Sequence, residues 1–267
     1  MSDTELYTQA RAFLIALAYT LPRTLALFLV VPIFNRQLMP ELVRYSIAAA
    51  LGALVAPALM SQVSVSELGG VHIALLIVKE AFVGFTLGFL IAIPFWAFEA
   101  IGFFIDNQRG ASVAASLNPL TGNDSSPMGI LFNQAFIVFF FISGGFLLML
   151  GVLYDSFRLW NVFSFYPQLH ADTMPLMLQQ LDRLVRIAVL LSAPAIVAMF
   201  LSEIGLALVS RFVPQLQVFF MAMPIKSAVA VLILMVYMST LFGYGLSYVE
   251  ELRGIVAWLG EQWGAPR

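Results

Sequence analysis

The sequence contains no cysteine and few charged residues. The absence of cysteine from the 267 residues excludes disulfides, thiolate nucleophiles and cysteine-based metal sites. Charged residues make up 10% of the chain, against roughly one-quarter in soluble domains, and the net charge is −2. Because such a chain lacks the dense basic face that releases counterions from nucleic acid, we expect no DNA or RNA partner.

Candidate catalytic residues are also scarce. His72 and His170 are the only histidines, and neither has the i, i+4 histidine partner of a helical zinc site. Ser143, in FISGG, resembles the Ser-Gly element of intramembrane serine proteases, but Phe141 stands where that family has glycine. No histidine follows in a later apolar segment to act as its base, and no Walker A lysine motif is present. The sequence therefore predicts no enzyme, metal or cofactor, with an intramembrane protease kept as a formal alternative.

Most of the sequence consists of apolar residues. They form 61% of the chain, and the mean hydropathy is +0.93. No alternating strand pattern appears, and only helices satisfy their own backbone in lipid without a closed barrel, so we predict an all-α membrane protein of about six elements. The N-terminus carries two acids before Arg11 and no small-residue cleavage site, so we expect the first helix to be retained. A hydropathy window of about 19 residues places the segments at 12–34, 46–60, 71–105, 130–153, 184–208 and 228–246.

Several charges lie inside these apolar segments. A charge at mid-membrane costs about 2.5–3.5 kcal/mol, so such residues face protein or water, either as structural pairs or as part of a pathway or assembly contact. The Lys and Arg residues of the predicted loops divide equally between the two sides, which leaves the topology open. Either the span count is wrong, or the helices do not end as ordinary bilayer spans. The internal charges are Arg23, Lys79, Glu80, Glu99 and Glu203.

Two local patterns predict helix contacts. Gly84 and Gly88, in GFTLG, lie one helical turn apart and would let another helix backbone approach closely. The tail 247–267 has the apolar spacing of an amphipathic helix. It holds more acids than arginines, whereas membrane-surface helices are usually rich in Lys and Arg, so we expect it to dock on protein. Its apolar positions are Val249, Leu252, Val256, Leu259 and Trp263.

A long polar interruption separates the third and fourth apolar segments. The stretch from Phe103 to Gln134 is rich in small and turn-forming residues, and connections of this length are often functional. Glycines and prolines there break helices and allow a compact fold that can move aside. An ordinary solvent loop is the alternative. Arg109 stands three residues after Asp106 and is in position to pair with it.

The stretch SRFVPQLQVFFMAMPIKS, Ser210 to Ser227, joins the last two apolar segments. Pro214 and Pro224 remove backbone donors and stop helix propagation, so a bend or hairpin is predicted. Arg211 and Lys226 flank apolar residues, a pattern suited to buried contact with other subunits. The apolar residues are Phe219, Phe220, Met221 and Met223.

This stretch resembles a known family. The signature of the SctT family of type III secretion export-gate subunits, and of its flagellar relative FliR, is similar to Arg211, Pro214 and Gln215 followed by Val218, Phe219, Met223, Pro224 and Lys226. The resemblance covers essentially the whole chain, and IDNQRGAS, Ile105 to Ser112, looks more like the virulence (injectisome) branch. It implies helical hairpins that assemble with SctR-like and SctS-like subunits into a helical pseudo-hexameric cone.

The resemblance also implies roles for parts of the chain. Residues 1–180 would correspond to an SctR-like part and 184–267 to an SctS-like hairpin, with the hairpin tip at Arg211–Lys226. It implies a bacterial inner-membrane location, further partners in an SctU-like switch protein and an SctV-like export gate, and unfolded secreted proteins as substrate. A small ion- or proton-coupled transporter using Glu80, Glu99 and Glu203 is the alternative. The implied plug loop, at about 109–128, includes Arg109, Gly110, Ala111, Ser112, Ala114, Ala115, Leu117, Asn118, Pro119, Leu120 and Gly122.

Overall fold

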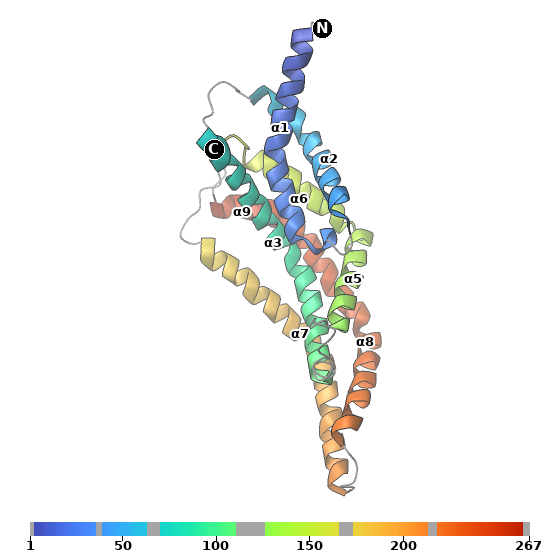
Figure 1. Cartoon of the computed structure of the whole chain (residues 1–267). Coiled ribbons are helices and arrows are strands. Elements are labelled where there is room, and N and C mark those ends of the chain that lie inside the picture. The colour runs from blue at the N-terminus through green and yellow to red at the C-terminus, as the bar shows by residue number, and fades with distance from the viewer. Residues whose placement is uncertain are drawn as a thin grey trace. The chain divides into compact units, whose positions relative to one another are not determined.

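The computed structural model describes residues 3–35, 39–62, 70–110, 126–165, 173–212 and 218–263, and these residues contain helices and no strand (Figure 1). The predicted all-α fold is therefore confirmed. Short 3-10 turns, η1 (Pro32–Phe34), η2 (Met60–Gln62) and η4 (Leu252–Gly254), accompany the α-helices. The α-helices are α1 (Asp3–Val30), α2 (Glu41–Leu59), α3 (Gly70–Arg109), α5 (Pro127–Ile142), α6 (Gly145–Leu159), α7 (Thr173–Phe212), α8 (Val218–Glu251) and α9 (Ile255–Trp263).

Each predicted apolar segment falls on these helices. Within the described ranges, five stretches are long and apolar enough to cross a membrane, and the α5–α6 pair passes the same test as one broken span. The segment predicted at 71–105 is a single helix of 40 residues, and α7 is equally long. The segment predicted at 130–153 is instead divided at Gly144, whose φ of 80° is left-handed and favours glycine.

The chain divides into two compact units that interleave along the sequence. Unit 1 comprises Met1–Ala92, Gly144–Met177 and Glu251–Arg267, and unit 2 comprises Ile93–Ser143 and Leu178–Glu250. This division concerns packing within one chain. The predicted division into 1–180 and 184–267 concerns likeness to sister subunits and stays a prediction.

Unit 1 is built on the adjacent helices α1 and α2, with α6 and α9 packed against each other. The Phe28 and Phe34 rings stack with centroids 3.6 Å apart where the chain leaves α1. On α9, Trp263 is buried with its ring centroid 5.4 Å from that of Trp160, and Gly260 faces Leu159 of α6. The tail thus docks on protein within its own unit, as the sequence predicted.

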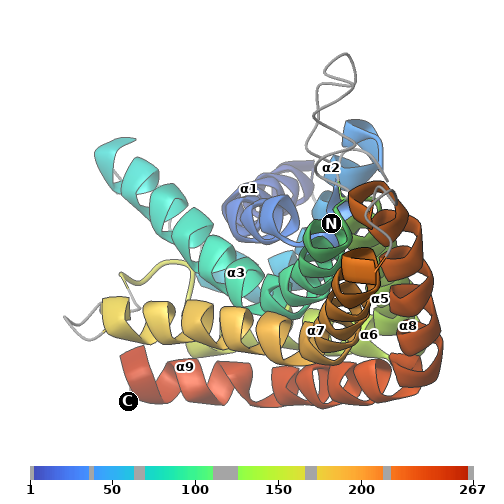
Figure 2. The same ribbon diagram turned by 90° about the horizontal axis from the view of Figure 1, so that it is seen from below.

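Unit 2 has an aromatic core contributed by α3, α5 and α8. Phe136 of α5 packs edge-on against Phe95 and stacks on Phe98, both from α3. Phe242 of α8 contacts Phe98 and the α5 residue Phe139, and α5 and α8 lie side by side in Figures 1 and 2. These rings bury large apolar areas, so they hold the three helices together.

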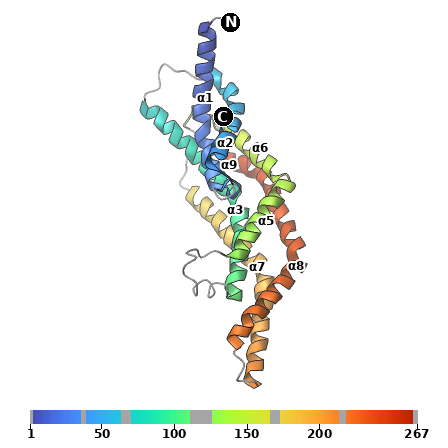
Figure 3. The same cartoon turned by 45° about the vertical axis from the view of Figure 1, so that its right-hand side comes forward.

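Helices α7 and α8 run side by side in unit 2 as a hairpin (Figures 1 and 3). The link between them, residues 213–217, lies outside the described residues. Pro224 does not stop helix propagation as predicted, because it lies inside α8. Membrane-type helices accept proline when their surroundings satisfy the freed carbonyl, and Pro22, Pro57, Pro94 and Pro194 also lie inside helices here.

Candidate functional site

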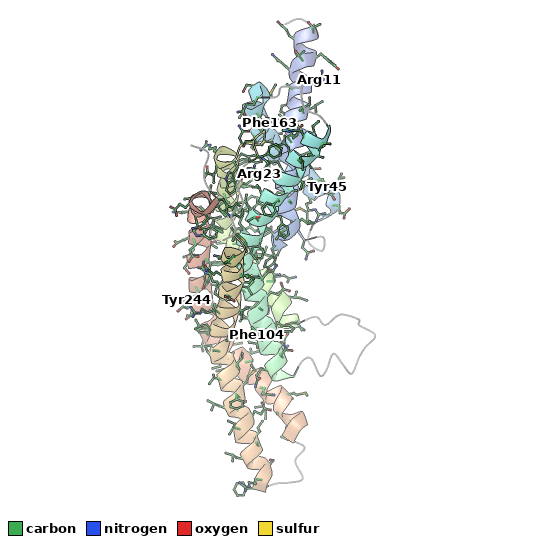
Figure 4. The ribbon with its side chains drawn as sticks, turned by 90° about the vertical axis from the view of Figure 1, so that its left-hand side faces the viewer. Arg11, Arg23, Tyr45, Phe104, Phe163 and Tyr244 are labelled. Carbon is green, nitrogen blue, oxygen red and sulfur yellow. The ribbon has the colours of Figure 1, made fainter. Side chains whose placement is uncertain are left out.

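A buried ion pair joins α1 to α3 in unit 1. The side chains of Arg23 and Glu80 are fully buried, and Arg23 Nε and Nη2 donate to the two Glu80 carboxylate oxygens at 2.7 and 2.8 Å. Arg23, labelled in Figure 4, also donates to Ser156 Oγ (3.1 Å) and to the Trp160 carbonyl (3.0 Å). Its guanidinium carbon lies 4.2 Å from the centroid of the Phe157 ring. The carboxylate thus binds the guanidinium bidentately, and the guanidinium also donates to α6 and to the residue after it. A bidentate pair of this kind both stabilises the contact and fixes the orientation of the two side chains.

Lys79 completes this cluster. Its Nζ lies 2.5 Å from Glu80 Oε1 and donates to the carbonyls of Asn161 and Val162 at 3.0 Å each. With the Trp160 carbonyl bound by Arg23, three successive carbonyls at the end of α6 receive donors from cationic side chains. These carbonyls belong to the residues that follow α6, where the partial negative charge of the helix C-terminus also favours the two cations. The cluster therefore fastens the end of α6 to α1 and α3.

Gly84 and Gly88 lie where α3 crosses α1. A Cβ atom added to Gly84 would come within 2.0 Å of the Arg23 carbonyl oxygen, and one on Gly88 within 3.0 Å of the Leu27 carbonyl oxygen. Any side chain at Gly84 would therefore push the backbones apart. The predicted close helix contact is confirmed, and it lies directly beside the Arg23–Glu80 pair.

A second polar site, in unit 2, brackets residues 111–125. Asp106, near the end of α3, accepts hydrogen bonds on Oδ2 from Ser126 Oγ (2.6 Å) and the Met128 amide (2.9 Å). Its Oδ1 has no hydrogen bond of good geometry but lies 2.7 Å from Arg109 Nη2. Ser126 Oγ also accepts from the Gly129 amide and caps α5. One buried carboxylate thus holds both flanks of the segment.

Close packing of α3 against α5 continues from this site. A Cβ atom on Gly102 would lie 2.4 Å from the Met128 backbone, and one on Gly129 would lie 3.1 Å from the Glu99 carbonyl oxygen. Glu99 itself accepts a hydrogen bond from Asn133 Nδ2 at 2.8 Å. The flanks of the 111–125 segment therefore rest on a rigid helix pair.

The anchor at Asp106 can be tested by mutation. Asp106→Ala should destabilise this helix pair by about 1–3 kcal/mol, because it leaves the partly buried Ser126 hydroxyl and Met128 amide without an acceptor. We expect faster amide hydrogen exchange at Met128 and Gly129, measured by mass spectrometry. The matched control is Asp155→Ala, which removes an exposed pair with Arg158 and should cost less than about 1 kcal/mol. Unchanged exchange at Met128 in Asp106→Ala would contradict the anchor.

The predicted hairpin-tip residues are only partly described. Gly110, which directly follows α3, faces Met223 of α8, whose Cε lies 3.5 Å from an added Cβ. Lys226 is 8% exposed and donates to Glu203 at 3.3 Å. Arg211 and Met221 are exposed. Pro214, Gln215 and the side chain of Phe219 lie outside the described residues.

The structure describes only the first two of the predicted plug residues. Arg109 contacts Asp106, and Gly110 has a positive φ of 88°. The remaining ones, Ala111, Ser112, Ala114, Ala115, Leu117, Asn118, Pro119, Leu120 and Gly122, lie outside the described residues.

The predicted buried charges have three different environments. Arg23 and Glu80 are fully buried, and the Lys79 side chain is 10% exposed. Glu99 is half-buried. Glu203 is the most exposed of them, with 47% of its side chain accessible in the single chain, and its burial against other subunits stays a prediction. It sits on the outward face of α7, and Lys226 reaches it from α8.

Sequence reasoning missed several partners of these charges. Ser126 had a recognisable signal, because serine followed by proline is a common start of a helix. Ser156, Asn133 and Gly102 gave none, since each acts through a neighbour from another helix. The carbonyl of Trp160 is a backbone group and leaves no trace in the sequence at all.

Together the fold and these sites define a helical membrane protein in which internal charges and glycines bind helices to one another. Among the described residues no group of three or more His, Cys, Asp or Glu side chains could hold a metal ion. The Ser143 hydroxyl donates to the Phe140 carbonyl of its own helix. In both sites the polar side chains of the described residues join helices of the chain to one another.

Comparison with known proteins identifies the family. The model of bacterial export proteins, family 1, matches residues 14–252, and the chain belongs to this family. It is 44% identical over 224 residues to Yop proteins translocation protein T of Yersinia pestis, covering 83% of this chain and 85% of that protein. It is 32% identical over 244 residues to the surface presentation of antigens protein SpaR of Shigella flexneri, covering 91% and 92%. With the flagellar biosynthetic protein FliR of Bacillus subtilis it shares 30% over 245 residues, covering 89% and 93%.

The family match settles the class of the protein. The chain is a multi-pass membrane component of a bacterial protein export apparatus, which assembles with other proteins of that apparatus and is not an enzyme. The resemblance inferred from the Arg211–Lys226 stretch is confirmed.

Proposed function

We propose that the chain completes the export gate of a type III secretion system in the bacterial inner membrane. In this proposal it assembles with SctR-like and SctS-like subunits into a cone, contacts an SctU-like switch protein and an SctV-like export gate, and lets unfolded secreted proteins pass. The virulence branch is favoured, because identity to the Yersinia translocation protein is 44% against 30% to the flagellar protein of Bacillus subtilis.

The gate itself would be the segment at about 109–128. It would help to seal the channel against ions and small molecules until substrate displaces it. The observation that carries this role is the Asp106 anchor, because a stopper must be held at both ends while its middle is displaced. Energy would come from other components of the system, since the sequence holds no Walker A motif.

The partner contacts would involve the exposed apolar faces of α7 and α8. Only 33% of the most apolar window of α7, and 22% of the corresponding window in α8–α9, is buried within the chain. Small residues and pairable charges let such helices pack on other helices. The half-exposed Glu203 fits this role better than a lipid-facing one, because lipid cannot solvate a carboxylate.

No observation favours the alternative of an ion- or proton-coupled transporter. Glu80 is fully buried and both of its oxygens are paired with Arg23 and Lys79, so it is not accessible to a transported ion. Glu203 is paired with Lys226. An intramembrane protease is set aside by the family match.

The gate can be tested by replacing residues 112–124 with a short Gly/Ser linker that leaves Arg109, Gly110 and Ser126 in place. In cells that carry the assembled system, membrane conductance to ions should rise, because the seal would be removed while its anchors remain. Conductance is measured by the decay of membrane potential after the system has assembled.

The matched control replaces residues 166–170, which connect other helices, with a linker of the same composition. It should leave conductance at the parental level. An unchanged potential in cells whose complex assembles normally around the shortened 112–124 segment would rule out the sealing role.

A further inference from the structure

One side of α7 combines a carboxylate with exposed apolar side chains. Phe200, Ile204 and Leu208 are exposed and recur every four residues, so they form a stripe along the helix. Glu203 borders this stripe, and 47% of its side chain is exposed. All four residues lie in the stretch Met177–Phe212, which is long and apolar enough to cross a membrane. We call the surface formed by these four residues the Glu203 face.

Neither water nor lipid suits the Glu203 face. Water would solvate the carboxylate but would leave the apolar stripe exposed, and contiguous exposed apolar surface marks interaction sites. Lipid would cover the stripe but would not solvate the carboxylate. A protein helix does both if it packs apolar side chains on the stripe and directs a hydrogen-bond donor to Glu203. The composition of the face therefore favours a helix of another protein as its occupant.

The contact with Lys226 leaves Glu203 open to a second donor. Lys226 Nζ donates to Glu203 Oε2 at 3.3 Å, which is longer than the roughly 2.7–2.9 Å typical of a bond between an ammonium and a carboxylate. No described residue donates a hydrogen bond to Glu203 Oε1. Arg211, the next cation along α7, is eight residues further on, which is about 12 Å along the helix axis. The second donor must therefore come from outside the part of the chain that the structure describes.

Glu80 shows how this chain satisfies a carboxylate inside an apolar helix. It lies between two cations, Arg23 from another helix and Lys79 from its own, and both of its oxygens are paired. Glu203 has only one cation, Lys226, and its second oxygen is on the exposed side. A cation on the helix that covers the Glu203 face would complete the same arrangement.

We propose that the Glu203 face docks a helix of a neighbouring subunit of the export apparatus and that this helix presents a lysine or arginine to Glu203. The inference rests on the proposed function, because it names the chemistry of one contact made by α7. The partner helix is apolar where it packs on Phe200, Ile204 and Leu208, and it carries one cation level with Glu203. That cation binds Oε1 while Lys226 keeps Oε2.

A charge swap within the chain separates the partner's cation from Lys226. Glu203→Lys combined with Lys226→Glu keeps the internal ion pair and reverses its direction, so the purified chain should melt like the parent. In cells that carry the export system, recovery of other apparatus proteins with this chain in mild detergent should fall at least about tenfold, because like charges across an interface repel strongly. The matched control is the exposed pair swapped as Asp155→Arg with Arg158→Asp, which should be recovered like the parent.

Photo-crosslinking then identifies the occupant of the face. Ala207 lies one turn beyond Glu203 and is exposed, and photoreactive benzoylphenylalanine replaces it in cells that carry the system. Mass spectrometry should place the crosslink within one turn of a Lys or Arg inside an apolar segment of another membrane protein. Replacing that cation with glutamate should restore recovery of the apparatus proteins with the charge-swapped chain.

Normal recovery with a charge-swapped chain that melts like the parent would overturn the inference. So would a crosslink to a second copy of this chain, to lipid alone, or to a segment without Lys or Arg. If the charge-swapped chain does not fold, the crosslinked segment decides the question. A parent chain that is recovered without any other apparatus protein would instead contradict the proposed function.

Discussion

Replacing Glu80 alone with leucine is expected to destabilise the chain by about 3–5 kcal/mol, because it leaves the cations Arg23 and Lys79 inside unit 1 without their carboxylate. Replacing Arg23 alone with methionine should cost less, because Glu80 keeps Lys79 as its partner. The Arg23 and Glu80 side chains are fully buried, and Arg23 makes bonds to α3 and to α6. Unfolding is followed in detergent by circular dichroism. The yield of folded chain should fall in parallel.

The double variant Arg23→Met with Glu80→Leu should recover much of this loss, because both charges leave together and the side chains stay apolar and bulky. Lys79 keeps its two carbonyl acceptors in that variant. The exposed pair Asp155 and Arg158 is the matched control, and its double replacement should change stability by less than about 1 kcal/mol. Additive losses in the double variant would show that the two charges do not act as a pair.

Substituting Gly84 with alanine is expected to cost about 3 kcal/mol, at the upper end of what overpacking does. The added Cβ would lie 2.0 Å from the Arg23 carbonyl oxygen, and backbone atoms cannot turn away as a flexible side chain can. The displacement would also pull Arg23 from Glu80. The melting temperature of the purified chain measures the loss.

Gly151→Ala is the matched control for this substitution. Gly151 lies inside α6 in the same unit, and an added Cβ would meet nothing within 4 Å. Alanine is the better helix former by up to about 1 kcal/mol, so this variant should be as stable as the parent or more so. Equal melting temperatures for the Gly84 and Gly151 variants would argue against the close crossing of α1 and α3.

Much of the fold could be predicted from local sequence. Apolar runs placed the helices because lipid and protein interiors both require a long stretch without charge, and Gly84 with Gly88 marked a crossing. The division at Gly144 escaped prediction. Two glycines after a serine give only a weak signal within a run that remains apolar on both sides.

Less of the two sites could be predicted. The charges were visible because they interrupt apolar runs, but their partners were not, since Arg23 meets Glu80 only after α1 and α3 have packed. The prediction for Pro224 was wrong because the rule that proline ends a helix describes helices in water-soluble proteins, where no neighbouring helix replaces the lost hydrogen bond. The exposure of Glu203 could not be predicted, since helical periodicity alone does not say which face of α7 remains uncovered.

The lengths of α3 and α7 have a consequence for how much of this protein a cell can make. Each contains 40 residues, which at 1.5 Å per residue gives a helix about 60 Å long, whereas the hydrocarbon core of a membrane is about 30 Å thick. Lipid can therefore surround only about half the length of such a helix. Copies made in excess of their partner proteins would expose apolar surface to proteases and chaperones. The cell must therefore make this protein in proportion to the proteins that cover the rest of these helices.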